Sequence, residues 1–154
     1  MQRYDVASGT FVSIAPDREA NNDDEGLSLS GPFAYFLSTV NVDRLEPFFR
    51  IMPLQRALPP PRDAKTMDVL VVRPLRDPSL EGKSGERERE RFKERIWNVL
   101  KRAFEDGAHI HARYDSDTQG GNADDQPVVE YFRVAGWEWI PVSFSSEIIS
   151  GPRF

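Results

Sequence analysis

The two histidines of this sequence are the first residues that could bind a metal or transfer a proton. His109 and His111 alternate within "AHIHARYDS" (108–116), a stretch that we predict to be a β-strand, so both imidazoles would share one face. Two imidazoles can begin a zinc site, but the sequence places no third ligand beside them. We therefore favour ordinary strand histidines over a metal site.

A second group of possible metal ligands lies in the acidic stretch "DSDTQGGNADDQ" (115–126). Positions one, three, five and six of a calcium-binding loop are matched by Asp115, Asp117, Gln119 and Gly120. The twelfth position, a bidentate glutamate in such loops, is Gln126, and no amphipathic helix follows it. A solvated hairpin loop is the better interpretation.

The tetrapeptide "EGKS" (81–84) invites comparison with a phosphate-binding loop. That motif requires another glycine five positions before Gly82, and the residue at that spacing is Asp77. We interpret the tetrapeptide as the start of a helix, with Ser84 as the N-cap.

Glu130 and Glu138 are the remaining carboxylates whose spacing suggests chemistry. Their even separation would place both on one face of a strand, unless Gly136 introduces a bulge that breaks the register. Salt bridges on a sheet surface would explain the two glutamates equally well. The sequence contains no Ser/His/Asp order and no nucleophile elbow, so hydrolase chemistry has no support.

The composition limits the class of protein. The 154 residues, 39% hydrophobic and 29% charged, suit one domain with a real core. The chain has no cysteine, which excludes disulfides, thiolate zinc sites, iron–sulfur clusters and cysteine nucleophiles. Its formal net charge of −5 gives no support for nucleic-acid binding, which favours concentrated positive charge.

The distribution of apolar residues bears on localisation. No apolar run approaches the roughly 20 residues needed to span a bilayer, and residues 1–26 lack the apolar centre of a signal peptide. We therefore expect a cytoplasmic protein. The run "GERERERFKER" (85–95) is nearly neutral, which favours a solvated helix face over a headgroup-binding patch. Peripheral contact with a membrane stays open, because it needs only an exposed apolar patch.

Hydrophobic periodicity predicts a strand-rich chain with one helix. Strands are expected at 10–16, 32–42, 67–75, 108–116 and 128–141, with a mobile loop at 17–31. Pro47 and Pro53 make 44–54 an irregular or edge segment. A helix within 80–107 should end at a left-handed Gly107, and its apolar stripe is Phe92, Ile96, Val99, Leu100, Ala103 and Phe104. This order predicts an α+β fold, or a β-sandwich with a helical insertion.

Four stretches, which together cover roughly residues 10–141, resemble a known family. They are "FAYFLSTVNV", "DAKTMDVLVVRPL", "FKERIWNVLKRAFEDGAHI" and "VVEYFRVAGWEWIP". Their content and order resemble the C-terminal lobe of the diacylglycerol kinase-like lipid kinases, especially the sphingosine (long-chain base) kinases of fungal type. The second stretch keeps Asp68 and the run Val69–Val72 of the family strand, but lacks the glycine of its usual Asp-Gly.

The resemblance implies a β-sandwich-like lipid-binding lobe over residues 1–142, followed by an irregular tail at 143–154. In the full-length family, ATP and Mg²⁺ bind a separate N-terminal lobe with a "GGDGT"-type loop, and a "DGE"-type motif lies near the nucleotide. Neither motif occurs in this sequence, which runs on from "WEWIP" into "VSFSSEIISGPRF". We therefore assign no catalytic, ATP-binding or metal-binding residue to this chain. We expect it to be inactive alone, as a truncated product whose partner is the missing kinase lobe.

The same resemblance suggests where a lipid would bind. The aromatic and aliphatic residues of 33–54 and 67–72 would build the core and an acyl-chain cleft, and the pocket candidates are Phe33, Tyr35, Phe36, Leu37, Phe48 and Phe49. The ligand would be a sphingoid base or diacylglycerol. Purely structural packing remains an alternative for each candidate. At the level of the whole chain, the alternatives are a non-catalytic lipid- or protein-interaction module and a small enzyme of another type.

Overall fold

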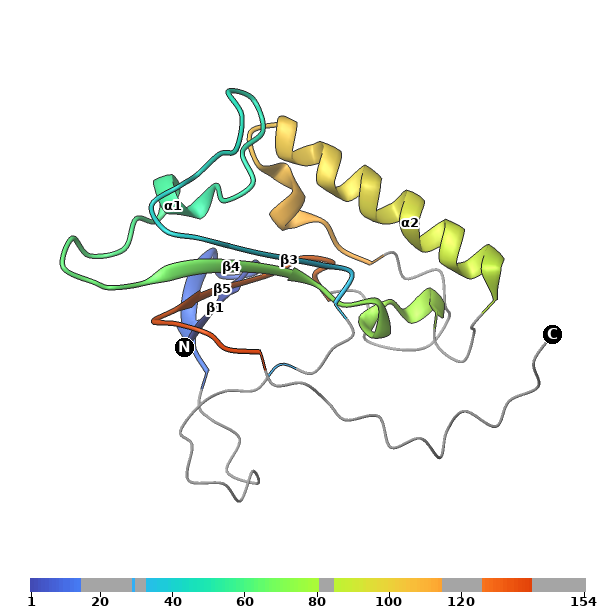
Figure 1. The fold of residues 1–154 in the computed structure, drawn as a ribbon, viewed down its shortest axis with the longest axis horizontal. Helices are drawn as coiled ribbons and strands as arrows, with labels where there is room; N and C mark the ends of the chain where they lie inside the picture. Colours follow the sequence, from blue (N-terminus) through green and yellow to red (C-terminus); the bar gives the residue numbers. More distant parts are fainter. Residues whose placement is uncertain (15–28, 30–32, 81–84, 115–125, 140–154) are drawn as a thin grey trace, which may run out of the picture.

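Five antiparallel strands form a single sheet in the computed structural model, which describes residues 1–14, 29, 33–80, 85–114 and 126–139. The strands lie in the order β2-β1-β5-β4-β3 (Figure 1). Their bounds are Gln2–Asp5 for β1, Thr10–Ser13 for β2, Tyr35–Thr39 for β3, Met67–Val72 for β4 and Glu130–Val134 for β5. The predicted strands at 10–16, 32–42 and 67–75 are confirmed with shorter bounds, while β1 was not predicted.

Strand β1 joins β2 through a tight turn that the sequence stabilises locally. The carboxylate of Asp5 accepts hydrogen bonds from the backbone N–H groups of Ala7 and Ser8, at 3.2 and 3.1 Å. Gly9 follows with a φ of 66°, a left-handed conformation that glycine adopts without steric cost. The hairpin then adds to the sheet by pairing β1 with β5.

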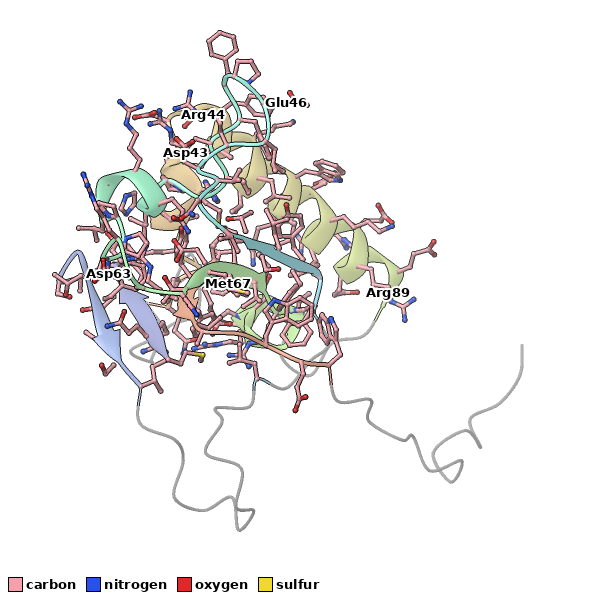
Figure 2. The ribbon with its side chains drawn as sticks, turned by 60° about the vertical axis from the view of Figure 1, so that its left-hand side comes forward. Asp43, Arg44, Glu46, Asp63, Met67 and Arg89 are labelled. Atoms are coloured by element: carbon pink, nitrogen blue, oxygen red, sulfur yellow. The ribbon has the colours of Figure 1, made fainter. Side chains whose placement is uncertain are left out.

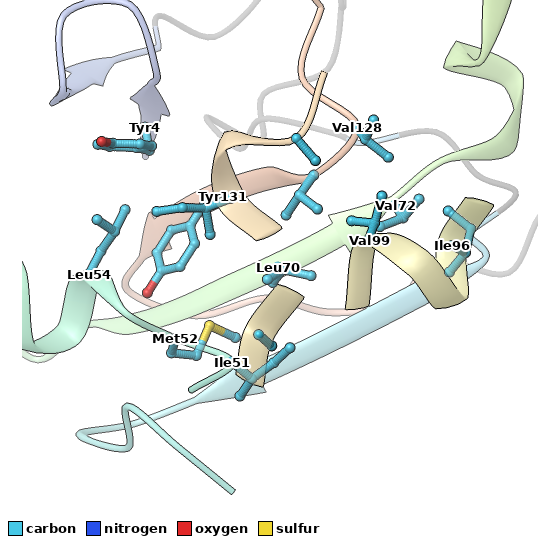
Figure 3. Close-up of a cluster of buried hydrophobic side chains, with 14 of the residues drawn as sticks. Tyr4, Ile51, Met52, Leu54, Leu70, Val72, Ile96, Val99, Val128 and Tyr131 are labelled. Atoms are coloured by element: carbon cyan, nitrogen blue, oxygen red, sulfur yellow. The ribbon is translucent and has the colours of Figure 1, made fainter. Parts of the chain in front are cut away.

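The central strands β4 and β5 are covered on both faces. Leu70, Val72 and Tyr131 point into the main core, on the side where α2 lies (Figure 3). Val69, Val71 and Phe132 point to the opposite face and form a second buried cluster. An unbroken apolar run such as "VLVV" is therefore required in β4, because both of its faces exclude water.

Helix α2 (Glu86–Lys101) supplies the layer over the first face of the sheet (Figure 1). Its Ile96 and Val99 are buried against the sheet, and a 3₁₀ turn, η3 (Arg102–Phe104), continues it and buries Ala103. Gly107 is left-handed as predicted, with a φ of 84°, but it precedes η4, and the helix itself ends earlier, at Lys101. The helix is shorter than predicted, since its N-cap is Gly85 and the proposed cap Ser84 lies outside the described residues.

The segment 44–54 is irregular, as its prolines predicted. An isolated bridge between Glu46 and Phe49 closes a turn, and the chain then buries Ile51 and Met52 completely. A short helix, α1 (Leu54–Ala57), follows Pro53.

The predicted strand at 108–116 is wrong. Residues Ala108–His111 form a 3₁₀ helix, η4, because the left-handed Gly107 reverses the chain and the Ala112 N–H then bonds to the His109 carbonyl. Only an isolated bridge, between Arg113 and Pro127, represents the expected pairing in the described part of this stretch.

The predicted strands at 67–75 and 128–141 are too long at their C-terminal ends. Strand β4 ends at Val72 because Pro74 opens a 3₁₀ turn, η1 (Pro74–Arg76), followed by η2 (Pro78–Leu80). Strand β5 ends at Val134, and the chain beyond it returns across the sheet so that Trp137 and Trp139 pack on Phe36.

The fold is therefore a strand-rich α+β domain with one long helix, as predicted. Its described strands all belong to one sheet, so a second sheet of a sandwich is not among them. The predicted tail at 143–154 lies outside the described residues, as does nearly all of the predicted loop at 17–31. In the described part of the chain, no helix has the length and apolarity required to cross a membrane.

Candidate functional site

An apolar groove between helix α2 and strand β3 is the feature best suited to binding a ligand. It has a volume of about 410 Å³. Tyr35 lines it from β3, Phe49 lines it from the loop that follows β3, and Phe92 and Leu100 line it from α2. Because β3 lies at the end of the strand order, the groove opens at the rim of the sheet.

Helical periodicity explains how α2 builds one wall of this groove. Phe92, Ile96 and Leu100, spaced four residues apart, form a row that faces the sheet, and Phe104 of η3 extends it. The adjacent row, Lys93–Trp97–Lys101, also lines the groove and forms its outer rim. The groove therefore has an apolar floor and a rim in which an indole ring lies between two ammonium groups.

The electrostatics of the groove follow from these few polar groups. Lys93 donates to the Glu90 carboxylate at 2.6 Å, one helical turn earlier, which partly neutralises that side of the rim. Lys101 provides the other positive charge. Tyr35 is half buried, and this burial raises the pKa of its phenol, so the hydroxyl is neutral at physiological pH.

The structure distributes the six predicted pocket residues among four places. Tyr35 and Phe49 line the groove, and Leu37 packs on the main core. Phe36 lies on the opposite face of the sheet, since alternate residues of β3 point to opposite faces, and Phe33, which precedes β3, packs against it there. Phe48 projects into solvent from the loop. The candidates therefore do not form one pocket, and Trp97, Lys93 and Lys101 of the groove were not predicted.

The opposite face of the sheet carries a cluster of four aromatic side chains. Phe33, Phe36, Trp137 and Trp139 contact one another with ring centroids 4.8–6.0 Å apart. Both tryptophans are partly exposed. A cavity of about 360 Å³ lies beside this aromatic cluster, lined by Ser38, Thr39, Val40, Met67, Gly136 and Trp137.

The two histidines do not form a metal-binding pair. His109 is completely buried, and its Nε2 lies 3.1 Å from the Ile51 carbonyl oxygen, whereas His111 is exposed. Burial lowers the pKa of His109 to about 4, so the imidazole is neutral at physiological pH. Among the described residues, no group of three or more carboxylates and imidazoles is placed to bind a metal ion.

The glutamates 130 and 138 do not act as a pair either. Glu130 is buried and accepts hydrogen bonds from Arg73, at 2.7 and 2.8 Å, and from Arg76 at 2.7 Å. Glu138 lies outside β5 and is exposed. The buried carboxylate is neutralised by two guanidinium groups, so it serves to pair these side chains and not to act with Glu138.

A second buried ion network joins β4 to β5. Asp68 is completely buried, accepts two hydrogen bonds from Arg133 at 2.8 and 3.0 Å, and accepts a third from the Tyr131 hydroxyl at 2.6 Å. Arg133 also donates to the Leu58 carbonyl, and its guanidinium lies 4.2 Å from the centroid of the Phe11 ring. The sequence analysis did not predict this network. Its signal was a charged residue within each of two apolar strands, Asp68 in β4 and Arg133 in β5.

Two sequence motifs lie outside the described residues. The tetrapeptide at 81–84 is not described, and of the acidic loop at 115–126 only Gln126 is.

The chain matches no protein-family model, no curated protein and no solved structure.

Proposed function

We propose that this chain is a lipid-binding lobe of the diacylglycerol kinase-like type, and that the groove between α2 and β3 receives the acyl chain of its ligand. The observation that carries this proposal is the groove itself, about 410 Å³ in volume and walled by Tyr35, Phe49, Phe92 and Leu100. Pockets for small ligands span about 300–1,000 Å³ and combine apolar walls with few polar groups.

The lysines at the rim restrict the headgroup. A lipid whose chain lies in the groove would place its headgroup beside Lys93 and Lys101, on either side of Trp97. A sphingoid amine would bring a third positive charge to this rim, whereas a carboxylate or a neutral glycerol hydroxyl would not. We therefore favour a neutral or acidic single-chain lipid, or one chain of a diacylglycerol, over a sphingoid base.

The catalytic step belongs to a nucleotide-binding lobe in this proposal. Phosphoryl transfer depends on positioning and on charge neutralisation by a phosphate loop, by metal ions and by basic groups. The sequence has neither the GGDGT-type nor the DGE-type motif of the family it resembles. The chain on its own would bind lipid without transferring phosphate, and the sheet would form one layer of the sandwich-like lobe, with ATP and Mg²⁺ supplied by the other lobe.

One observation favours a second candidate function, a protein-interaction module. Trp137 and Trp139 remain partly exposed on the aromatic cluster, on the face of the sheet opposite the groove. Exposed tryptophans are enriched at protein interfaces. A nucleotide-binding lobe docked on this face would leave the groove open.

Fluorescent-lipid titration tests the groove directly. Ala34 is exposed and lines the groove, so Ala34→Trp would fill it without removing a core side chain. We expect the wild type to bind a soluble NBD-labelled fatty acid, and Ala34→Trp to weaken that binding by about tenfold or more, because the ligand loses most of its apolar contact. Ala57→Trp, at an exposed position of α1, is the matched control and should bind as the wild type does.

Competition with unlabelled lipids tests the headgroup. Oleate and monoolein should displace the probe at lower concentration than sphingosine. Equal binding by the wild type and Ala34→Trp would refute the groove as the site, and preferential displacement by sphingosine would refute the role given to the lysines. Phospholipid product from radiolabelled ATP and the purified chain alone would contradict the assignment of catalysis to another lobe.

A further inference from the structure

Four large apolar side chains are exposed along one edge of the molecule, around the groove. Phe48 is 81% exposed, Trp97 66%, Phe104 54% and Leu45 53%. Single exposed apolar residues are common on protein surfaces, but several on adjoining elements indicate an interaction surface.

These side chains lie on three adjoining elements, the loop after β3, α2 and η3, and we call the four together the docking edge: Leu45, Phe48, Trp97 and Phe104. Phe49 joins the loop to η3, because its ring lies 4.7 Å from that of Phe104. The loop closes on itself through the hydrogen bond from the Leu45 N–H to the Phe49 carbonyl, at 3.1 Å, which leaves Phe48 at its tip. Trp97 lies beside Phe49 and Phe104 along the groove.

The loop that carries Leu45 and Phe48 projects from the molecule (Figure 1). Figure 1 shows the loop between β3 and α1 reaching past the C-terminal end of α2. In Figure 2 its residues Arg44 and Glu46 lie at the far end of the molecule from the sheet residue Met67. A projecting tip with aromatic side chains suits insertion into the interface of a bilayer, where phenyl and indole rings partition favourably.

The charges beside the tip largely pair with one another. Asp43 forms ion pairs with Arg44 at 3.0 Å and with Arg50 at 3.5 Å, and Arg50 also pairs with Asp106. Because its charges are balanced, the loop tip gains little from anionic lipids, so apolar insertion must drive the association of the tip with a membrane.

From the projecting tip, the rings on adjoining elements and the paired charges, we propose that the docking edge binds the surface of a lipid bilayer by insertion of Phe48 and Trp97. This inference rests on the proposed function. The groove opens between α2, which carries Trp97, and the loop that carries Phe48, so a lipid of the bilayer could insert its acyl chain there. The partner of the docking edge is the bilayer itself, and a bilayer of zwitterionic phosphatidylcholine should be enough for binding.

Sedimentation with sucrose-loaded phosphatidylcholine vesicles tests the inference. We expect the wild type to sediment with the vesicles, and Phe48→Glu to lower its partition coefficient by about tenfold or more, since an inserted phenyl ring is replaced by a charge. Val12→Glu is the matched control: Val12 is an exposed apolar residue on β2, at the other edge of the sheet from β3, and its variant should sediment as the wild type does.

The two variants distinguish membrane binding by the docking edge from lipid binding in the groove. Ala34→Trp should sediment normally while losing the soluble fatty acid, and Phe48→Glu should bind that fatty acid normally while losing the vesicles. Equal sedimentation of Phe48→Glu and the wild type overturns the inference. So does a requirement for phosphatidylserine that 0.5 M salt abolishes, because electrostatics would then dominate. A change in oligomeric state with Phe48→Glu, without vesicle binding by the wild type, would assign the docking edge to a second copy of the chain.

Discussion

At the scale of single residues, the charged groups buried in the sheet are matched with one another. Asp68 and Arg133 occupy facing positions of β4 and β5, and Tyr131 completes the hydrogen bonding of the carboxylate. Burial raises the pKa of the Tyr131 phenol, with the Asp68 charge and the hydrogen bond to it adding to the effect, so the hydroxyl remains a donor. Each buried charge has a partner, and this pattern indicates a structural clamp.

His109 makes the stability of the protein depend on pH. Burial lowers its pKa from 6.5 to about 4, so the folded state binds the proton more weakly than the unfolded state. Well above pH 6.5 the imidazole is neutral in both states and does not contribute to the pH dependence. As the pH falls towards about 4, the unfolded state takes up a proton that the folded state does not, and the free energy of unfolding should decrease by about 3 kcal/mol.

Urea denaturation at a series of pH values between 7.5 and 4 measures this effect. His109→Gln removes the titrating group, so the decrease across this window should become smaller, whatever the stability of the variant at pH 7.5. The exposed His111 provides the matched control, and His111→Gln should keep the wild-type pH dependence. A wild-type slope in His109→Gln would assign the acid sensitivity to other groups.

At the scale of elements, periodicity predicted the parts whose pattern is long or uniformly apolar. The stripe of α2 and the apolar run of β4 were both located correctly. Strand β1 was missed because only Tyr4 of its four residues is buried, which leaves no alternation to detect. The segment after Gly107 has strand-like composition, but its geometry is set by the left-handed glycine and by tertiary packing.

The groove, too, was predictable from the sequence only in part. Tyr35 and Phe49 were candidates because the resemblance to the lipid kinases implied an acyl-chain cleft among the aromatic and aliphatic residues of 33–54, and both line the groove. Phe36, one residue from Tyr35, points to the other face, and a list drawn from composition cannot separate the two without the register of the strand. Trp97 was overlooked because it lies outside the core-facing stripe of the helix, where a ligand-binding wall has no sequence signal.

Gly107 should be irreplaceable in the turn between η3 and η4. A Cβ at this position would lie 2.6 Å from the Pro53 Cβ, and the φ of 84° disfavours any side chain. We expect Gly107→Ala to reduce the free energy of unfolding by about 2–4 kcal/mol, from backbone strain and this overlap together. Urea denaturation provides the measurement.

Gly9 separates the two contributions. Its φ of 66° is also left-handed, but a Cβ there would meet no atom within 4 Å. Gly9→Ala should therefore cost only about 1 kcal/mol, the backbone term alone. Equal losses for the two variants would show that contact with Pro53 contributes nothing.

At the scale of the whole molecule, the two faces of one sheet serve different purposes. The face beneath α2 holds the main core and, at its rim, the groove and the docking edge. The other face is partly covered by the chain after β5, whose tryptophans pack on β3. A ligand on the first face and a protein partner on the second would therefore not compete.

Phe36 should hold the chain after β5 on the sheet. Its ring contacts Trp137 and Trp139 at centroid distances of 5.0 and 4.8 Å. We expect Phe36→Ala to lower the free energy of unfolding by about 1–3 kcal/mol and to shift tryptophan emission to longer wavelength, because both indoles gain contact with water. A Trp97→Phe background restricts the emission to these two tryptophans among the three in the chain.

Phe104→Ala in that background removes a similarly large ring that contacts Phe49, and it should leave the emission unchanged. Unchanged emission in Phe36→Ala as well would mean that Trp137 and Trp139 are held on the sheet by contacts other than Phe36.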